Sequence, residues 1–204
     1  MPGSETITRA GPGRPRDPAV AAAIISAARD AVVEDGYEDT TLAAIARRAG
    51  VSIPTIYRRW ASKAELIEEA VLHLDTFDLP DPTGDLLVDL RTWVRLFLEV
   101  ATEPAARAAV PGLLAGYGRD PASYHRLLRR GELPVRAALE GLVAAAAADG
   151  RAAPDCDAGA VFDIIRGATF FRALTHADDG ADAFCERLAD GLWRMMQVLP
   201  QANH

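Results

Sequence analysis

Apolar residues recur at every third or fourth position along most of this chain, which is the period of helices with one buried face. The first such segment runs from Asp17 or Pro18 to Asp35, and its apolar stripe holds Val20, Ile24, Ala27, Ala28, Ala31 and Val32. Asp17 suits a helix N-cap, Pro18 suits the first helical position, and Gly36 suits the end of a helix. The segment therefore predicts an amphipathic first helix.

Residues 40–51 predict a second helix followed by a tight turn. Thr40 or Thr41 can cap this helix, whose inner face holds Leu42, Ile45, Ala46 and Ala49. Gly50 supplies the left-handed turn that other residues resist, and Val51 returns to the core.

Residues 52–74 predict a third, short helix and a fourth helix. Ser52 is the expected N-cap of the third helix, with Pro54 in its first turn, and its inward residues are Ile56 and Trp60. Ser62 and Glu65 form a capping box for the fourth helix. A short helix with a small and polar outer face after a glycine turn favours insertion into a DNA groove.

A break at residues 78–84, rich in Pro, Asp and Gly, separates this head from a larger C-terminal part. There we expect helices over residues 85–102, 104–118, 121–149, 155–175 and 181–199. Pro111 and Gly112 are expected to disturb the second of these, and a bend is expected near residues 131–134. The prediction is an all-α chain of about nine helices, divided into a flexible basic arm (1–16), a head (17–77) and a bundle (83–200).

Composition supports a packed helical protein, because 50 % of the residues are hydrophobic and only 6 % are aromatic. The net charge of −7 argues at first sight against a nucleic-acid partner. However, residues 1–63 hold nine Lys/Arg and seven Asp/Glu, a net +2, and residues 64–204 hold thirteen and twenty-two, a net −9. The acidity therefore belongs to the C-terminal part, and the mildly basic segment 1–63 is compatible with DNA.

Several classes of protein are disfavoured by what the sequence lacks. It shows no HExxH, no GxSxG, no phosphate-binding glycine loop and no Cys/His metal spacing, so no catalytic residue, cofactor or metal ligand is expected. No apolar stretch reaches the ~18 residues that span a membrane. Residues 14–30 only imitate a signal peptide, and Cys156 and Cys185 fit free thiols in a reducing compartment. A cytoplasmic protein is expected.

The head carries a set of residues at fixed offsets: Ile45-Ala46, Ala49-Gly50-Val51-Ser52, Pro54-Thr55-Ile56-Tyr57, Trp60, Ser62-Lys63 and Leu66. This set closely resembles the DNA-binding domain of TetR-family transcriptional regulators over residues 17–75. Residues 83–200 resemble that family's ligand-binding and dimerisation domain more loosely, mainly in length, helix number and the stretch Phe170-Phe171-Arg172. The resemblance implies a homodimer that binds a palindromic operator, with the action of a repressor, and is released by a small-molecule effector.

A helix in the major groove must bring short side chains to base edges, and Ser52, Ile53, Pro54 and Thr55 meet this demand. The residues that resemble the family's phosphate contacts are Thr41, Tyr57 and Lys63. Of four nearby arginines, Arg47 and Arg58 are the chosen DNA contacts, while Arg59 can pair with an acid of the fourth helix. Trp60 stands where the family often has phenylalanine, and Ile53-Pro54 where it often has lysine-glycine, so this pair is where the chain's own base preference is expected.

The arm carries Arg14 and Arg16 on an extended Gly-Arg-Pro-Arg element. Such an arm can enter a minor groove, and the alternative is a solvated tail that aids solubility.

The effector is expected to be largely apolar and to bind in the C-terminal part. Its candidate contacts are Trp93, Phe97, Leu113, Leu114, Tyr117, Tyr124, His125, Phe162, Arg166, Phe170 and Arg172. The alternative is that most of the aromatic residues are ordinary core. The last two helices are apolar on more than one side and need a second neighbour, so the dimer interface is predicted at Phe171, Leu174, Phe184, Leu188, Leu192 and Met195.

Two other classes of function stay open from the residues alone: an enzyme, and a helical interaction module without operator binding. A steep loss of DNA affinity with rising salt would distinguish a DNA-binding protein from both.

Overall fold

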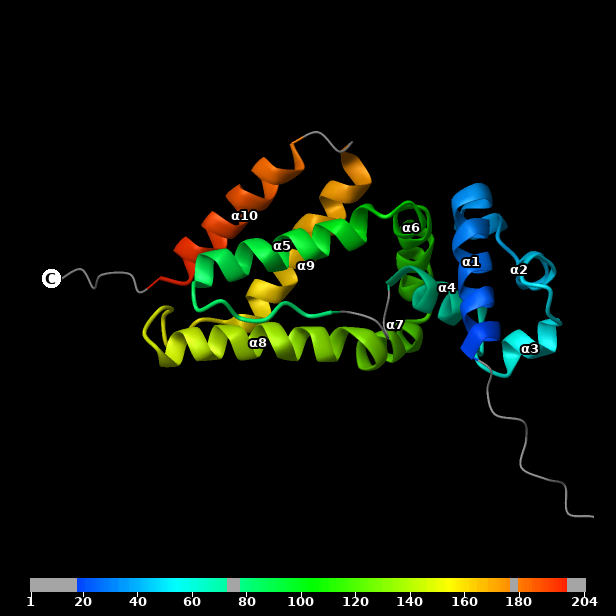
Figure 1. Cartoon of the computed structure of the whole chain (residues 1–204), viewed down its shortest axis with the longest axis horizontal. Helices are drawn as coiled ribbons and strands as arrows, with labels where there is room; N and C mark the ends of the chain where they lie inside the picture. Colours follow the sequence, from blue (N-terminus) through cyan, green and yellow to red (C-terminus); the bar gives the residue numbers. More distant parts are fainter. Residues whose placement is uncertain (1–17, 73–77, 177–179, 198–204) are drawn as a thin grey trace, which may run out of the picture.

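The computed structural model describes residues 18–72, 78–176 and 180–197, and these form ten α-helices and one π-helical turn without a β-strand. One end of the molecule holds α1 (Pro18–Asp39), α2 (Leu42–Arg48), α3 (Ile53–Tyr57) and α4 (Lys63–Leu72) (Figure 1). The remainder holds α5 (Leu86–Thr102), α6 (Pro104–Arg119), α7 (Pro121–Leu127), α8 (Leu133–Ala148), α9 (Ala158–Thr175) and α10 (Ala181–Met195). The predicted all-α fold is confirmed.

The predicted helix over residues 121–149 is in fact two helices, which accounts for the difference between nine and ten. They are joined by the π-helical turn η1 (Leu128–Glu132), which lies at the expected bend. Pro134 follows directly, and because proline has no backbone N–H it cannot continue the regular ladder of hydrogen bonds. By contrast, α6 is continuous although Pro111 and Gly112 lie inside it, so these two residues do not interrupt that helix.

The end of α1 and the start of α2 are fixed by two neighbouring threonines. Gly36 adopts φ 77° and ψ 169°, which breaks the regular helix before Asp39. Thr40 Oγ donates to the Gly36 carbonyl over 2.6 Å, while Thr41 Oγ accepts the Ala44 amide over 3.1 Å. Thr41 is therefore the cap of α2, and Thr40 closes the end of α1.

A variant of the predicted capping box forms at the start of α4, in which Glu65 bonds the amide of Ala61 instead of that of Ser62. Ser62 Oγ accepts the Glu65 amide over 3.1 Å, and the Glu65 carboxylate accepts the Ala61 amide over 2.8 Å. These two bonds satisfy amide groups that a helix start leaves without intrahelical partners, so the direction in which α4 leaves the turn is well defined.

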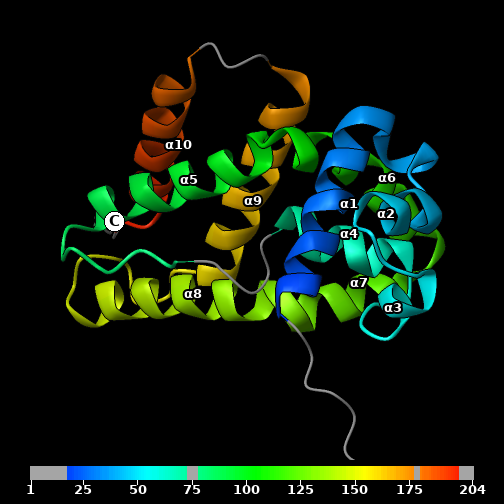
Figure 2. The same ribbon diagram turned by 45° about the vertical axis from the view of Figure 1, so that its right-hand side comes forward.

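Two hydrophobic cores divide the molecule, and their boundary does not coincide with the predicted break at residues 78–84. The first core joins α1–α4 to four residues of α6, namely Ala105, Ala106, Ala109 and Leu113. The second joins α5, α8, α9 and α10. Figures 1 and 2 show α6 against the head and the other C-terminal helices beyond it. Helix α6 thus belongs to the C-terminal part by sequence and to the head by packing.

Candidate nucleic-acid interface and ligand cavity

Helix α3 presents one buried and one exposed face. Ile56 and, just beyond the helix, Trp60 are 0 % exposed and anchor it to the first core. The residues predicted to meet DNA lie on the opposite side, where Ser52, Ile53, Pro54, Tyr57 and Arg58 are exposed and Thr55 is half-buried. Helices α2 and α3 lie at the end of the molecule remote from α8, α9 and α10 (Figure 1). The exposed face is therefore clear of the C-terminal bundle.

Three of these side chains are tied into one polar row. Thr55 Oγ lies 2.9 Å from Ser52 Oγ and accepts a hydrogen bond from Arg58 over 3.0 Å. The row holds the Arg58 guanidinium close to the surface of α3. A charged group fixed in this way suits contact with a phosphate or with a base edge.

The four arginines of α2 and α3 and the turns after them differ in whether a carboxylate of the protein pairs with their charge. Arg48 pairs with Glu34 over 2.8 Å, and Arg59 lies 3.6 Å from Glu69 and over the Trp60 ring. Within residues 18–72, 78–176 and 180–197, no carboxylate pairs with Arg47 or Arg58. The two arginines chosen from the sequence are thus the ones whose charge stays available to an external anion, and the expected pairing of Arg59 with α4 is confirmed.

Lys63 has partners inside the head. Its ammonium donates to the carbonyls of Tyr37 over 2.7 Å and Glu38 over 3.2 Å, and lies 4.5 Å from the centre of the Tyr37 ring. In this structure Lys63 closes the end of α1, and its phosphate contact stays a prediction. Arg14 and Arg16 lie outside the described residues.

A cavity of about 540 Å³ lies among α5, α6, α7, α8 and α9, with the end of α4 at its edge. Eight of the predicted ligand contacts line it: Phe97, Leu113, Leu114, Tyr117, Tyr124, Phe162, Arg166 and Phe170. Seven further residues line the cavity although they were not predicted from the sequence: Leu72, Val100, Val110, Leu127, Glu132, Val135 and Gly167. Most of these stand three or four positions from a predicted lining residue, so helical spacing was the available signal.

Three predicted ligand contacts do not line this cavity. Trp93 is 3 % exposed and packs within the second core, so it is a structural residue. His125 is exposed, with Nδ1 2.8 Å from the Pro121 carbonyl of its own helix. Arg172 lies 4.8 Å from the centre of the Phe184 ring of α10. Trp93 and Arg172 are turned toward other helices and His125 toward solvent, and spacing in the sequence does not determine these directions.

The polar end of the cavity is built around Arg166. Its Nη1 donates to Tyr124 Oη over 2.9 Å and pairs with the Glu132 carboxylate, and its Nη2 lies 3.6 Å from Asp163. Burial lowers the pKa of Arg166, but the hydrogen bond to Tyr124 and the charges of Glu132 and Asp163 outweigh burial and raise it overall. Arg166 is therefore a permanent cation whose partners are supplied by the protein.

One wall residue of the cavity is bonded to the head. Tyr117 Oη donates to the Glu68 carboxylate on α4 over 2.9 Å. Burial, together with the charge of Glu68, raises the pKa of Tyr117 well above its usual value, so the phenol stays protonated and remains a donor. The next residue of α4, Glu69, accepts a hydrogen bond from the Trp60 indole over 2.8 Å. Two neighbouring residues of α4 are therefore bonded in opposite directions, Glu68 to the cavity wall and Glu69 to Trp60 at the end of α3, and the backbone of α4 joins them.

Helices α9 and α10 carry apolar side chains that this chain does not cover. Phe171 is 67 % exposed, Met195 is 53 % and Leu174 is 38 %, and Ile164, which was not predicted, is 39 %. Phe171 and Leu174 also line the cavity, so they stand at its open side.

Three other residues predicted for the dimer interface are directed inward. Leu192 is 3 % exposed, and Phe184 and Leu188 are partly buried, because all three pack against the second core. Their apolar character is explained within the chain.

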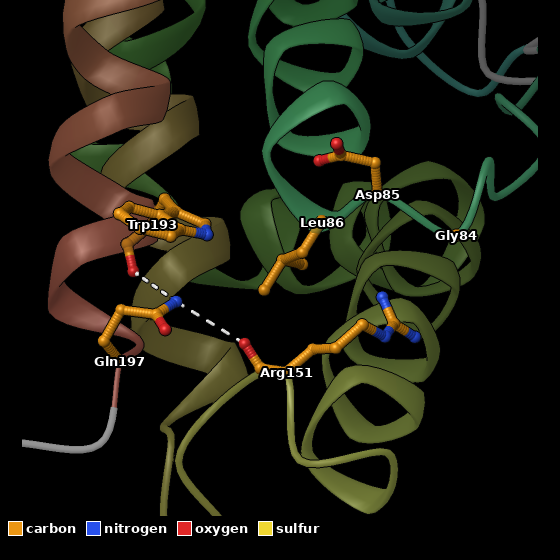
Figure 3. Close-up of a pocket in the computed structure, with 6 residues that line it drawn as sticks. All are labelled: Gly84, Asp85, Leu86, Arg151, Trp193 and Gln197. Carbon is orange, nitrogen blue, oxygen red and sulfur yellow. Dashed lines mark hydrogen bonds between the residues drawn. The ribbon is translucent and has the colours of Figure 1, made fainter.

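A second hollow, of about 370 Å³, lies between the start of α5, the loop after α8 and the end of α10. Figure 3 shows Gln197 between Trp193 and Arg151, and its amide donates to the Trp193 carbonyl over 3.2 Å and to the Arg151 carbonyl over 3.4 Å. Its lining residues, Gly84, Asp85, Leu86, Arg151, Trp193 and Gln197, all lie outside α1–α4.

The described residues include no group of three or more His, Cys, Asp or Glu that could hold a metal ion. No described helix combines the length and the hydropathy needed to cross a membrane. Cys156 and Cys185 are free thiols, as expected.

Comparison with known proteins identifies the two parts of the chain. Residues 24–70 match the family "Bacterial regulatory proteins, tetR family", and residues 79–192 match "Tetracyclin repressor-like, C-terminal domain". The chain belongs to the TetR family. It is therefore a helix-turn-helix transcriptional regulator, of a family without enzymatic activity, which removes the enzyme alternative.

Relatives of this TetR-family regulator extend over nearly its whole length. The uncharacterized HTH-type transcriptional regulator YdeS of Bacillus subtilis is 32 % identical over 188 residues, which cover 91 % of this chain and 94 % of that protein. The DNA-binding transcriptional repressor TetR of Mycobacteroides abscessus is 29 % identical over 171 residues, or 83 % of this chain and 89 % of that protein. The crystal structure of the TetR family transcription regulator SCO0332 covers 89 % of this chain and 99 % of its own, with 29 % identity and a TM-score of 0.67.

Proposed function

We propose that this TetR-family regulator is a homodimeric repressor that binds a palindromic operator through α3 and is released when a small molecule occupies the cavity. The observation that carries this proposal is a pair of hydrogen bonds on neighbouring residues of α4, from Tyr117 in the cavity wall to Glu68 and from Trp60 beyond α3 to Glu69. The repressor named among the relatives supports the sign of regulation.

The short length of α3, the helix proposed to enter the DNA groove, is the reason to expect a dimer. One helix of five residues reaches only a few base pairs, so specific recognition needs two half-sites related by a two-fold axis. The exposed apolar residues Ile164, Phe171, Leu174 and Met195 supply a surface on α9 and α10 for a second copy. In such a dimer the spacing of the two α3 helices fixes the spacing of the half-sites.

Release requires that the ligand favour one arrangement of the dimer over another, since a ligand shifts an equilibrium only by its differential affinity. Tyr117 stands in the cavity wall and holds α4 through Glu68. A ligand that displaces Tyr117 would move α4, and α4 would move Trp60 and α3. The distance between the two reading helices would then no longer fit the operator.

The proposed binding to an operator is tested with a palindromic sequence taken from the DNA that flanks the protein's own coding region. The dissociation constant is measured by fluorescence anisotropy over a salt series, and we expect the logarithm of the affinity to fall linearly with the logarithm of salt. Arg47→Ala is expected to weaken binding and to reduce that slope by about one. Arg48→Ala is the matched control, because Arg48 is paired with Glu34.

Equal losses from the two substitutions would contradict the assignment of Arg47. An affinity that does not respond to salt would contradict operator binding itself.

A further inference from the structure

The charges at the polar end of the cavity neutralise one another. Glu132 pairs with Arg166 on one side and lies 3.7 Å from Arg136 on the other. Arg136 is also 2.5 Å from Asp163 and 3.7 Å from Glu140. The three carboxylates and two guanidinium groups together carry a net charge of −1.

This cluster disfavours a charged ligand. A ligand carboxylate would meet a net negative charge, and it could pair with Arg166 only by displacing Glu132, whose side chain is 13 % exposed. Glu132 would then keep only Arg136, at 3.7 Å, and the loss of the nearer partner of a largely buried carboxylate is unfavourable. A ligand ammonium would find Glu132 already held by two guanidinium groups, so it would lose its own hydration for little gain.

The cavity nevertheless offers the hydroxyl of Tyr124 as a hydrogen-bond donor to a ligand. Tyr124 Oη lines the cavity and accepts the hydrogen bond from Arg166, and within the described part of the chain no hydrogen bond uses its phenol proton. The neighbouring Tyr117, whose ring centre is 5.4 Å away, already donates its hydrogen bond to Glu68. An oxygen atom of an uncharged ligand is the partner that the Tyr124 proton lacks.

We propose that the cavity takes an uncharged, largely apolar ligand, and that Tyr124 donates a hydrogen bond to a carbonyl, ether or hydroxyl oxygen at its one polar end. This inference rests on the proposed function, in which the cavity is the effector site. Its volume of about 540 Å³ lies within the roughly 300–1,000 Å³ that small-molecule sites occupy.

The test uses three probes with the same apolar chain and different head groups: 2-decanone, decanoate and decylammonium. Each is titrated into the full-length protein at neutral pH by isothermal calorimetry. The ketone is expected to bind at least roughly tenfold more tightly than either ion, because only the ions must give up hydration at a paired cluster. Tyr124→Phe is expected to weaken binding of the ketone by about three- to tenfold, the effect of one neutral hydrogen bond.

A change of selectivity gives the sharper result. Glu132→Gln removes the charge that occupies Arg166, so decanoate is expected to gain roughly tenfold or more while 2-decanone changes little. Glu140→Gln makes the same change of charge at a residue that does not line the cavity, and it is expected to leave decanoate binding nearly unchanged.

Tighter binding of decanoate or decylammonium to the unsubstituted protein would overturn the proposal. So would failure of all three probes to bind, or equal effects of Glu132→Gln and Glu140→Gln. Operator affinity is measured separately: if 2-decanone binds with the expected selectivity but does not release DNA, the ligand class stands and the proposed gating fails.

Discussion

The two cores of this protein differ in how completely they are packed. In the head, the anchoring side chains Ile45, Ile56 and Trp60 are all 0 % exposed. The C-terminal bundle instead surrounds a cavity of about 540 Å³ and leaves Phe171 67 % exposed. A closed core suits a rigid surface that must keep its shape against DNA, whereas an open one leaves space for a ligand and a surface for a second subunit.

Helix α6 is what brings these two regions into contact. Its alanines complete the core of the head, while Leu114 and Tyr117 on the same helix line the cavity. Arg29 of α1 strengthens the junction, because it donates to the Ala70 carbonyl of α4 over 2.9 Å and pairs with Glu103 before α6. A movement at the cavity wall therefore reaches the head through a shared helix.

The largest expected contrast is in the free energy of unfolding, between a substitution at the buried Trp60 of the head and one at the exposed Leu114 of the cavity. Trp60→Ala empties a fully buried site and is expected to lower the free energy of unfolding by about 3–5 kcal/mol. Leu114→Ala removes a side chain that is 54 % exposed at the cavity and is expected to change it by less than about 0.5 kcal/mol. Urea unfolding at one fixed protein concentration measures both, because the stability of the proposed dimer would depend on concentration. Comparable losses would show that the two regions are not packed differently.

The second contrast lies within α6 and tests the junction with the head. A Cβ at Gly112 would stand 2.2–2.9 Å from three atoms of Tyr37, including its Cβ, so turning the ring alone does not relieve the clash. Overpacking by Gly112→Ala is expected to lower the free energy of unfolding by about 1–3 kcal/mol. The higher helix propensity of alanine offsets ~1 kcal/mol of this loss.

Gly116→Ala is the matched control, because a Cβ there meets no atom within 4 Å. It is expected to stabilise by about 0.5–1 kcal/mol, measured in the same unfolding experiment. Changes of the same sign at both glycines would contradict the close approach of α6 to Tyr37.

The third contrast concerns the bond between cavity and head. A double-mutant cycle of Tyr117→Phe and Glu68→Gln is expected to give a coupling free energy of about 1–2 kcal/mol, since the bond is partly buried and its acceptor is charged. The comparison cycle uses Arg95→Ala and Asp182→Ala, an ion pair whose side chains are 52 % and 78 % exposed, and is expected to give nearly zero. If the exposed pair couples as strongly, Tyr117 has no special role in linking the two regions.

The smallest expected effect is on the reactivity of the two thiols. It tests whether the second core, which borders the cavity, opens readily to solvent. Burial raises the pKa of Cys185 and of Cys156, so both are held protonated in the folded state. A raised thiol pKa favours the folded protein below the unfolded-state value of about 8.5, and this contribution is lost as the pH rises through the folded-state value.

Alkylation by iodoacetamide at mildly basic pH should therefore be slower in the native protein than in urea, and slower at Cys185, which is 2 % exposed, than at half-buried Cys156. Cys156→Ala isolates the rate of Cys185. Equal rates with and without urea would show that the core around the cavity opens readily.

Much of this molecule follows from local sequence. Gly36, Thr41, Ser62 with Glu65, and Asp157 fix helix ends through bonds and backbone angles that involve residues only a few positions away. The exposed row on α3 follows from the same reasoning, because Ile56 and Trp60 must face inward and the helical period then sends Ser52, Ile53 and Arg58 outward. Local patterns therefore predicted the head and its candidate contacts with DNA.

Other features were decided only when distant helices packed together. The sequence places α6 beyond a proline-rich break, yet its small residues fit the head, and Gly112 is explained only by Tyr37, seventy-five positions earlier. Glu132 lines the cavity although it was not predicted to do so. Trp93, His125 and Arg172 do not line it, because Trp93 packs in the second core, His125 is exposed and Arg172 lies against Phe184 of α10. Periodicity gives the faces of a helix, but which face meets a core, a cavity or a second subunit depends on the packing of the whole chain.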